Sequence, residues 1–209
     1  RSTRLPRAIR DVYKRQVICP NDLLTQPIKD TTDKPVNTTK PKAIAPKFKN
    51  IKKAAKLINK SKKPVVLFGV GAQHAKDELR EFVEMAKIPV IHTLPAKAII
   101  ADDHPYNLGN LGQIGTKASY QTIQDADLLI MIGTNFPFVK YLPKKNIKAI
   151  QIDTKEENIS HRFDINVGIL GDSKIALQQL TENIKHVAKR PFLDKALDRK
   201  AVWDKWMEQ

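Results

Sequence analysis

Six short turns contain the residue types of this sequence that suit binding of a phosphorylated ligand. Glycine lets a backbone approach a ligand closely, and free N–H groups at a helix start attract an anion. The turns read GVGA (69–72), TLPAK (93–97), GNLGQIG (109–115), GTNFPF (133–138), QID (151–153) and GDS (171–173). Taken alone, each is also typical of a plain tight corner, so the phosphate hypothesis depends on their lying together.

The first turn departs from the fingerprint of nicotinamide dinucleotide sites. The third glycine of G-x-G-x-x-G would stand at His74, and the next apolar run ends in VIHTL without an acidic residue. Asp153 and Asp172 instead follow two later apolar runs, where a carboxylate could accept hydrogen bonds from a ribose hydroxyl or an adenine amino group. The alternative for both is capping of the next helix, for which Asp172 has the typical position before SKIALQQL.

Apolar runs alternate with amphipathic segments, and these elements must position the turns. The periodicity predicts strands over 65–69, 89–93, 128–133, 149–153 and 167–171, and helices over 50–61, 75–87, 116–124 and 174–188. Continuous apolar strands such as DLLIMIG are typical of burial on both faces, and their alternation with helices indicates a parallel sheet. We therefore predict an α/β fold, a doubly wound parallel sheet. Such a sheet brings all six turns to the carboxyl edge of the strands, where these folds bind ligands.

Positive charge is concentrated in the first third of the chain. The formal net charge is +15; residues 1–66 hold 18 Lys and Arg against 4 Asp and Glu, and residues 67–209 hold 19 against 18. Over residues 31–50 the lysines alternate with Pro, Thr and Asn, and Phe48 is the only aromatic residue. This composition is typical of a solvated linker and unlike a nucleic-acid interface, so we expect no nucleic-acid partner.

Other classes of function find little support. Cys19 is the only cysteine, which excludes an intrachain disulfide and a cysteine-based zinc site and indicates a reducing, cytoplasmic compartment. No stretch approaches the roughly 18 apolar residues that span a bilayer. The five histidines lack metal-ligand spacing, no Gly-x-Ser-x-Gly elbow is present, and DDHP at 102–105 has the composition of a loop.

Composition and periodicity divide the chain into segments. Residues 1–16 are basic and lack strand or helix periodicity, so we interpret them as a non-native leader. The later segments are a remnant of a preceding domain (17–24), a basic linker (25–46), a central domain (47–190) and a helix leading to a further domain (191–209). That helix places Phe192, Ala196, Trp203 and Trp206 near one face, which indicates a core contact with a part of the protein beyond this sequence.

The order of the motifs GVGAQHA, IPVIHTLPAKAII, HPYNLGNLG, ADLLIMIGTNFPF, IKAIQIDT and ISHRFDINVGILGDS resembles the central domain of thiamine-diphosphate-dependent enzymes. It is most similar to the FAD-containing pyruvate oxidases, including the bacterial type that passes electrons to menaquinone, and the resemblance runs from about Val17 to Gln209. It implies a Rossmann-like domain over 47–190 that holds FAD in an extended pose across the strand ends. It also implies that 17–24 derive from the amino-terminal, pyrimidine-binding domain and that 191–209 lead to the carboxy-terminal domain.

The resemblance implies which residues would bind FAD. Gly69, Gly71 and Ala72 would face its phosphate and ribityl stretch, and Asp153 and Asp172 would hold its adenosine end. The wall along the extended cofactor would be formed by Thr93, Leu94, Pro95, Gly109, Asn110 and Gly112. Its ribityl and flavin side would lie beside Gly133, Asn135 and Phe136. No residue receives a catalytic or metal-binding role.

The resemblance also implies an activity for the parent enzyme. With thiamine diphosphate and Mg²⁺ it would decarboxylate pyruvate oxidatively to acetate or acetyl phosphate and pass electrons through FAD to quinone or oxygen. The glutamate that activates thiamine and the Gly-Asp-Gly…Asn magnesium motif belong to the flanking domains, so this chain alone should not be catalytic. The family further implies a homo-oligomer, a tetramer, in the cytoplasm, with any membrane contact through the carboxy-terminal part.

Two alternatives stay open. An acetolactate synthase or a decarboxylase of the same superfamily would share this domain, with FAD structural or absent; the aromatic turn TNFPF favours the oxidase. In a different class of function, the domain would serve subunit packing alone and its glycines would be tight corners. Because the isoalloxazine end normally rests against neighbouring domains, we expect this chain to retain flavin weakly.

Overall fold

The computed structural model describes residues 22, 26–27 and 43–208. The chain divides into two units, Arg1–Pro41 and Lys42–Gln209, and the second contains the fold. The expected leader over 1–16, Cys19 and most of the expected remnant and linker lie outside the described residues.

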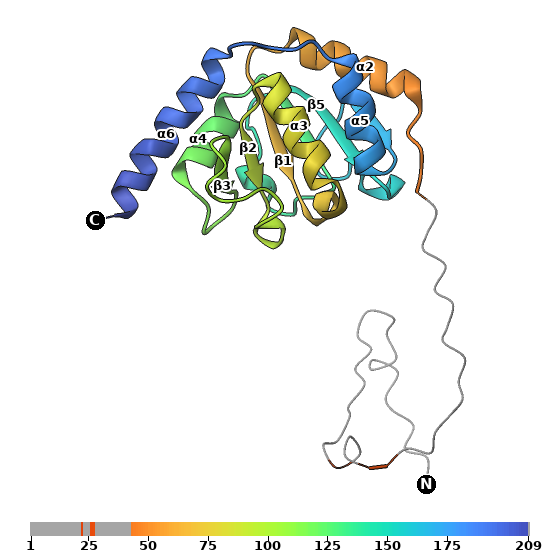
Figure 1. Ribbon diagram of the computed structural model, residues 1–209, viewed down its shortest axis with the longest axis horizontal. Coiled ribbons are helices and arrows are strands. Elements are labelled where there is room, and N and C mark those ends of the chain that lie inside the picture. Colours follow the sequence, from red (N-terminus) through yellow and green to blue (C-terminus); the bar gives the residue numbers. More distant parts are fainter. Residues whose placement is uncertain (1–21, 23–25, 28–42, 209) are drawn as a thin grey trace. The chain divides into compact units, whose positions relative to one another are not determined.

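A six-stranded, all-parallel sheet forms the centre of the second unit (Figure 1). Its strands are β1 (Pro64–Phe68), β2 (Val90–His92), β3 (Asn107–Asn110), β4 (Leu128–Ile132), β5 (Lys148–Asp153) and β6 (Val167–Leu170). Their order is β3-β2-β1-β4-β5-β6, and every residue of β1 and β4 is buried. The chain thus winds outward in both directions from β1 and β4, which confirms the predicted doubly wound fold.

Helices cover both faces of the sheet. On one face pack α2 (Phe48–Lys60), α3 (Lys76–Ala86) and α5 (Ser173–Asn183), which bury apolar residues such as Ile51, Phe82 and Leu177. On the other face pack α4 (Lys117–Asp125) and α6 (Pro191–Met207), which contribute Ile123 and Phe192 to a second core. The hydrophobic faces of these helices therefore close the sheet on both sides. None of the described helices is both long and apolar enough to cross a membrane.

The predicted strands agree with the structure to within one residue at either end, but one strand was missed. The prediction assigned residues 109–115 to a turn, whereas β3 occupies Asn107–Asn110. Glycine and asparagine are typical of turns, and an edge strand tolerates them because it has a neighbour on one side only. The register between β2 and β3 also shifts between Val90 and His92.

The helix predicted over 174–188 is too long, because α5 ends at Asn183. The following segment hydrogen-bonds to other elements instead of continuing the helix: Lys185 N donates to Asn59 Oδ1 and Val187 N donates to Met85 O. The other three predicted helices agree to within two residues, and DDHP forms turns as expected.

The final helix, predicted over 191–209, spans Pro191–Met207. Of the four residues predicted on its apolar face, Phe192 and Ala196 are buried against the domain, whereas Trp206 is 61% exposed. The first half of α6 is therefore part of the fold, and its second half extends beyond the sheet (Figure 1).

Candidate cofactor-binding site

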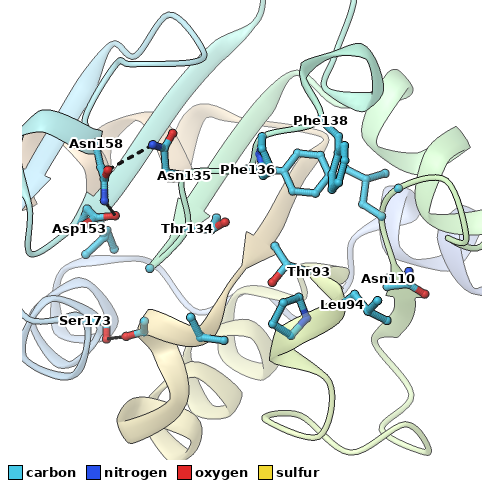
Figure 2. A pocket seen from close by; sticks show the side chains of 18 of the residues that line it. Thr93, Leu94, Asn110, Thr134, Asn135, Phe136, Phe138, Asp153, Asn158 and Ser173 are labelled. Carbon is cyan, nitrogen blue, oxygen red and sulfur yellow. Dashed lines mark hydrogen bonds between the residues drawn. The ribbon is translucent and has the colours of Figure 1, made fainter. Parts of the chain in front are cut away.

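A cavity of about 640 Å³ lies along the carboxyl ends of the strands. Each of the six turns identified in the sequence contributes at least two residues to its wall. Its volume is within the range of about 300–1,000 Å³ that is usual for small-molecule and cofactor sites. The turns therefore lie together, as the hypothesis of a binding site required (Figure 2).

The middle of the cavity lies where the loops after β1 and β4 touch. Gly71 N donates to Gly133 O over 3.1 Å. A Cβ atom at Gly133 would lie 2.4 Å from the carbonyl carbon of Gly71, and one at Gly69 would lie 2.7 Å from Gly133 O. Gly133 also has a left-handed φ of 58°. These glycines thus permit direct contact between two backbones at the point where the strand order reverses, the usual ligand crevice of such folds.

One end of the cavity is polar and is organised by a chain of hydrogen bonds (Figure 2). Asp153, which is 8% exposed, accepts from Lys155 N (2.9 Å) and from Asn158 Nδ2 (3.1 Å). Asn135 Nδ2 in turn donates to Asn158 Oδ1 over 3.2 Å. The outer oxygen of this chain, Asn135 Oδ1, is buried and has no hydrogen-bond partner among the described residues. Ser173 Oγ donates to Gly71 O over 2.8 Å and joins this end to the middle.

The other end is apolar (Figure 2). The rings of Phe136 and Phe138 pack edge to face, with centroids 5.6 Å apart. Phe136 is buried, but Phe138, Leu94 and Ile114 are between 52% and 71% exposed. Such an arrangement presents apolar surface to a planar ring and leaves part of it open to solvent.

Charge within the cavity wall is restricted to the polar end, where Asp153 and Lys155 are the charged residues. Behind the wall, burial lowers the pKa of His92, so its imidazole is neutral near pH 7. His92 Nδ1 lies 3.1 Å from Thr93 O, and in the neutral ring this nitrogen must be the one that donates. His92 thereby supports the backbone of Thr93 and does not itself line the cavity.

Ten of the residues predicted to bind a cofactor line the cavity. They are Gly71, Thr93, Leu94, Pro95, Asn110, Gly112, Gly133, Asn135, Phe136 and Asp153. The structure thus brings together most of the predicted site, although the role of each residue in binding stays a prediction.

Four predicted residues do not line the cavity. Gly69 packs against the Gly133 loop, and Ala72 is fully buried in the core. Gly109 belongs to β3, with a φ of 94°. Asp172 has the capping role that was its alternative: its Oδ1 accepts from the backbone N–H groups at the start of α5, and its Oδ2 lies 2.9 Å from His74 Nε2.

Sequence reasoning missed several lining residues. Thr134 and Phe138 lie in the turn GTNFPF and Ser173 in GDS, so the motifs contained a signal that the residue assignments did not use. Asn158 and Lys155 follow β5 in a polar segment with no motif. Their place in the wall depends on how that segment folds back toward β4.

The fold and the cavity together define a doubly wound, Rossmann-like domain with a site where such domains bind nucleotide cofactors. The family model described as thiamine pyrophosphate enzyme, central domain, matches residues 51–180. The chain belongs to this family of thiamine pyrophosphate (thiamine diphosphate) enzymes and contains their central domain.

Curated relatives extend the comparison. A Bacillus subtilis protein, YdaP, described provisionally as thiamine pyrophosphate-containing, is 39% identical over 98% of this chain and 36% of its own length. A Methanocaldococcus jannaschii protein, provisionally named an acetolactate synthase large subunit, is 40% identical over 68% of this chain and 25% of its own length. The pyruvate oxidase of Lactiplantibacillus plantarum is 27% identical over 68% of this chain and 24% of its own length. The chain thus spans between 24% and 36% of the length of these relatives.

Proposed function

We propose that this domain binds FAD in the cavity and that the parent protein is a thiamine-diphosphate-dependent pyruvate oxidase. The observation that carries the FAD proposal is the two-ended cavity, with Asp153 at its polar end and the Phe136–Phe138 pair at its apolar end. FAD has the same asymmetry, because an adenosine group and an apolar isoalloxazine ring are joined by a phosphate and ribityl chain.

The residues present fit each part of that cofactor. Each oxygen of the Asp153 carboxylate keeps a lone pair beyond its present partner and so can accept from a ribose hydroxyl. Asn135 Oδ1 is a buried acceptor without a partner in the described part of the chain, which costs free energy of desolvation. A hydrogen-bond donor on the ligand would remove that cost. In the middle, the glycines at positions 71 and 133 leave backbone without side chains along the wall, which suits a pyrophosphate.

When bound, FAD would supply the redox chemistry of the reaction, and the chain's own residues would bind and orient it. Phe136 and Phe138 would offer an apolar contact to the isoalloxazine. Leu94 and Phe138, which are half exposed, would exclude water from that ring once another part of the longer protein covers them. We therefore keep the proposal that this chain alone retains flavin weakly and is not catalytic.

The proposed reaction of the parent protein is oxidative decarboxylation of pyruvate to acetate or acetyl phosphate, with quinone or oxygen as electron acceptor. The aromatic turn TNFPF and the relative named pyruvate oxidase support it. We also propose a cytoplasmic homo-oligomer that uses Mg²⁺ with thiamine diphosphate and contacts a membrane, if at all, through a carboxy-terminal part.

A second candidate is an acetolactate synthase, which is favoured by the 40% identity to a protein of that provisional name. The two candidates differ in product. The full-length enzyme, supplied with pyruvate, thiamine diphosphate, Mg²⁺ and FAD, should reduce an added electron acceptor and form acetate or acetyl phosphate if it is an oxidase. Formation of acetolactate without net reduction of the acceptor would contradict the oxidase proposal and support the synthase.

The FAD proposal is tested on the 209-residue chain by titrating FAD, with FMN and NAD in parallel, and following flavin fluorescence and the melting temperature. We expect saturable binding of FAD without binding of FMN. Asp153→Ala should weaken FAD binding about 10- to 100-fold, because a hydrogen bond to a charged group contributes roughly 1.5–3 kcal/mol.

Asp102→Ala is the matched control, since Asp102 is exposed and does not line the cavity. A cooperatively melting chain that binds no FAD, or one in which both aspartate variants bind as the wild type does, would contradict the site assignment.

A further inference from the structure

Gln151 on β5 has a buried side chain, and both its Nε2 and its Oε1 form hydrogen bonds with loops at the polar end of the cavity. It is 2% exposed and does not line the cavity. Its Nε2 donates to Thr134 O (3.2 Å) in the loop after β4 and to Asn158 O (3.1 Å) in the segment after β5. Its Oε1 accepts from Ser160 N over 3.0 Å. One carboxamide therefore ties together two loops that are separate in the sequence.

The two loops carry the residues that form the polar end. Thr134 lies between Gly133 and Asn135, and Asn158 connects Asn135 to Asp153 (Figure 2). Asp153 can only accept hydrogen bonds when it is ionised, so Asn158 must turn its Nδ2 toward it and its Oδ1 toward Asn135. The orientation of both amides in this hydrogen-bonded series follows from Asp153. The distances between the three side chains depend on where the backbone of Asn158 is held.

Gln151 also supports an unfavourable backbone conformation. Ser160 has a φ of 63°, in the left-handed region that residues other than glycine rarely adopt. Such conformations persist where the surroundings hold them, and they are frequent at functional sites. The hydrogen bond from Ser160 N to Gln151 Oε1 restrains this residue, which lies in a mostly exposed segment.

We propose that Gln151 is a positioning residue for the nucleoside end of the cavity. It touches no ligand, but it sets the separation between the Thr134 loop and Asn158, and through Asn158 it sets the orientation of Asp153 and Asn135. This inference rests on the proposed function, because the ligand that it concerns is the adenosine part of FAD.

A second glutamine offers a close control. Gln124, at the end of α4, donates from Nε2 to Tyr141 O (3.1 Å) and Leu142 O (3.0 Å), and its Oε1 accepts from Lys144 N (3.2 Å). Gln124 thus bridges backbone groups in the same pattern as Gln151, but neither it nor its partners line the cavity. A substitution there removes an equivalent set of hydrogen bonds away from the proposed site.

The test compares Gln151→Glu and Gln151→Met with Gln124→Glu and Gln124→Met in the 209-residue chain. Glutamate keeps the acceptor and loses both donors, and methionine removes all three hydrogen bonds at a similar volume. The dissociation constants of FAD and of ADP, which lacks the flavin, are measured for each variant at a temperature where its melting curve shows a folded chain.

We expect both Gln151 variants to bind FAD and ADP roughly tenfold more weakly than the wild type, the effect of about one lost hydrogen bond. The Gln124 variants should stay within about twofold of the wild type, since their hydrogen bonds do not reach the site. Hydrogen exchange at the Ser160 amide should accelerate in Gln151→Met and stay slow in Gln151→Glu, which keeps the acceptor.

Equal losses of affinity at positions 151 and 124 would overturn the inference, because they would indicate general destabilisation. Unchanged FAD and ADP affinity in the Gln151 variants would overturn it as well while leaving the proposed function in place. If the wild-type chain binds neither ligand, the proposed function fails, and the positioning role of Gln151 fails with it.

Discussion

Replacement of Gly133 by alanine should separate the two loops that form the middle of the cavity. A Cβ atom there would lie 2.4 Å from the carbonyl carbon of Gly71, 2.6 Å from its Cα and 2.7 Å from Ala72 N. All three are backbone atoms, so no side chain can rotate to make room. The loop after β1 or the loop after β4 must move, and the bond from Gly71 N to Gly133 O must lengthen or break.

Two costs add to the expected loss of stability. An alanine at a φ of 58° is in the left-handed region, which costs about 1–2 kcal/mol. Insertion of a methyl group into a well-packed contact costs about 1–3 kcal/mol more. We therefore expect the free energy of unfolding to fall by about 2–5 kcal/mol, out of about 5–15 kcal/mol for an ordinary domain. The melting temperature should fall by about 4–20 °C, because each kcal/mol shifts it by about 2–4 °C in a domain of this size.

The control is Gly112→Ala in the same cavity wall. Gly112 has a φ of 139°, and a Cβ atom there would meet no atom within 4 Å. This variant therefore carries a backbone cost alone. Because alanine adopts a φ near 139° even less readily than one near 58°, its loss of stability in urea without ligand is an upper bound on the backbone cost at Gly133. A loss of about 1–2 kcal/mol or less for Gly133→Ala, which is the cost of the left-handed backbone alone, would refute the argument that backbone contact requires glycine at 133.

Two further predictions concern charges at the helix ends. Hydrogen bonds from Arg199 and, to a lesser extent, Lys195 lower the pKa of Asp125 from 3.8 to about 2. The ionised Asp125 therefore stabilises the fold above about pH 4, and this contribution is lost as the pH falls toward 2. Because Asp125 is partly exposed and its charge is screened by solvent, we expect this contribution to the free energy of unfolding to be about 0.5–1 kcal/mol. Urea unfolding at pH 5 and pH 2.5 measures it, and Asp125→Asn should lose that part of the pH dependence. Asp172→Ala should lower the free energy of unfolding by about 1 kcal/mol through loss of the α5 cap; an unchanged value would indicate that the cap contributes nothing.

The chain by itself determined the class of fold and the edge of the sheet that carries the site. Apolar runs such as LLIMI are long enough for a strand and have no polar face, so they must be buried on both sides. Parallel strands end at a common edge, and turns that are far apart in sequence therefore meet there. For this reason Gly71, Gly133 and Asp153, which end or follow predicted strands, could be predicted to lie at one site from the order of strands and helices alone.

Other features depended on contacts that no local pattern encodes. β3 is built from turn-forming residues and forms a strand because β2 offers a free edge. Asp153 ends β5 and Asp172 closely follows β6, yet Asp153 lines the cavity and Asp172 caps α5, because only Asp172 is followed at once by a helix with free N–H groups. Asn158 belongs to no motif, and Gln151 opens the turn QID but carries no local signal for its role between two loops. Their roles arise from hydrogen bonds between loops, and those bonds exist only once the sheet has brought the ends of β4 and β5 together.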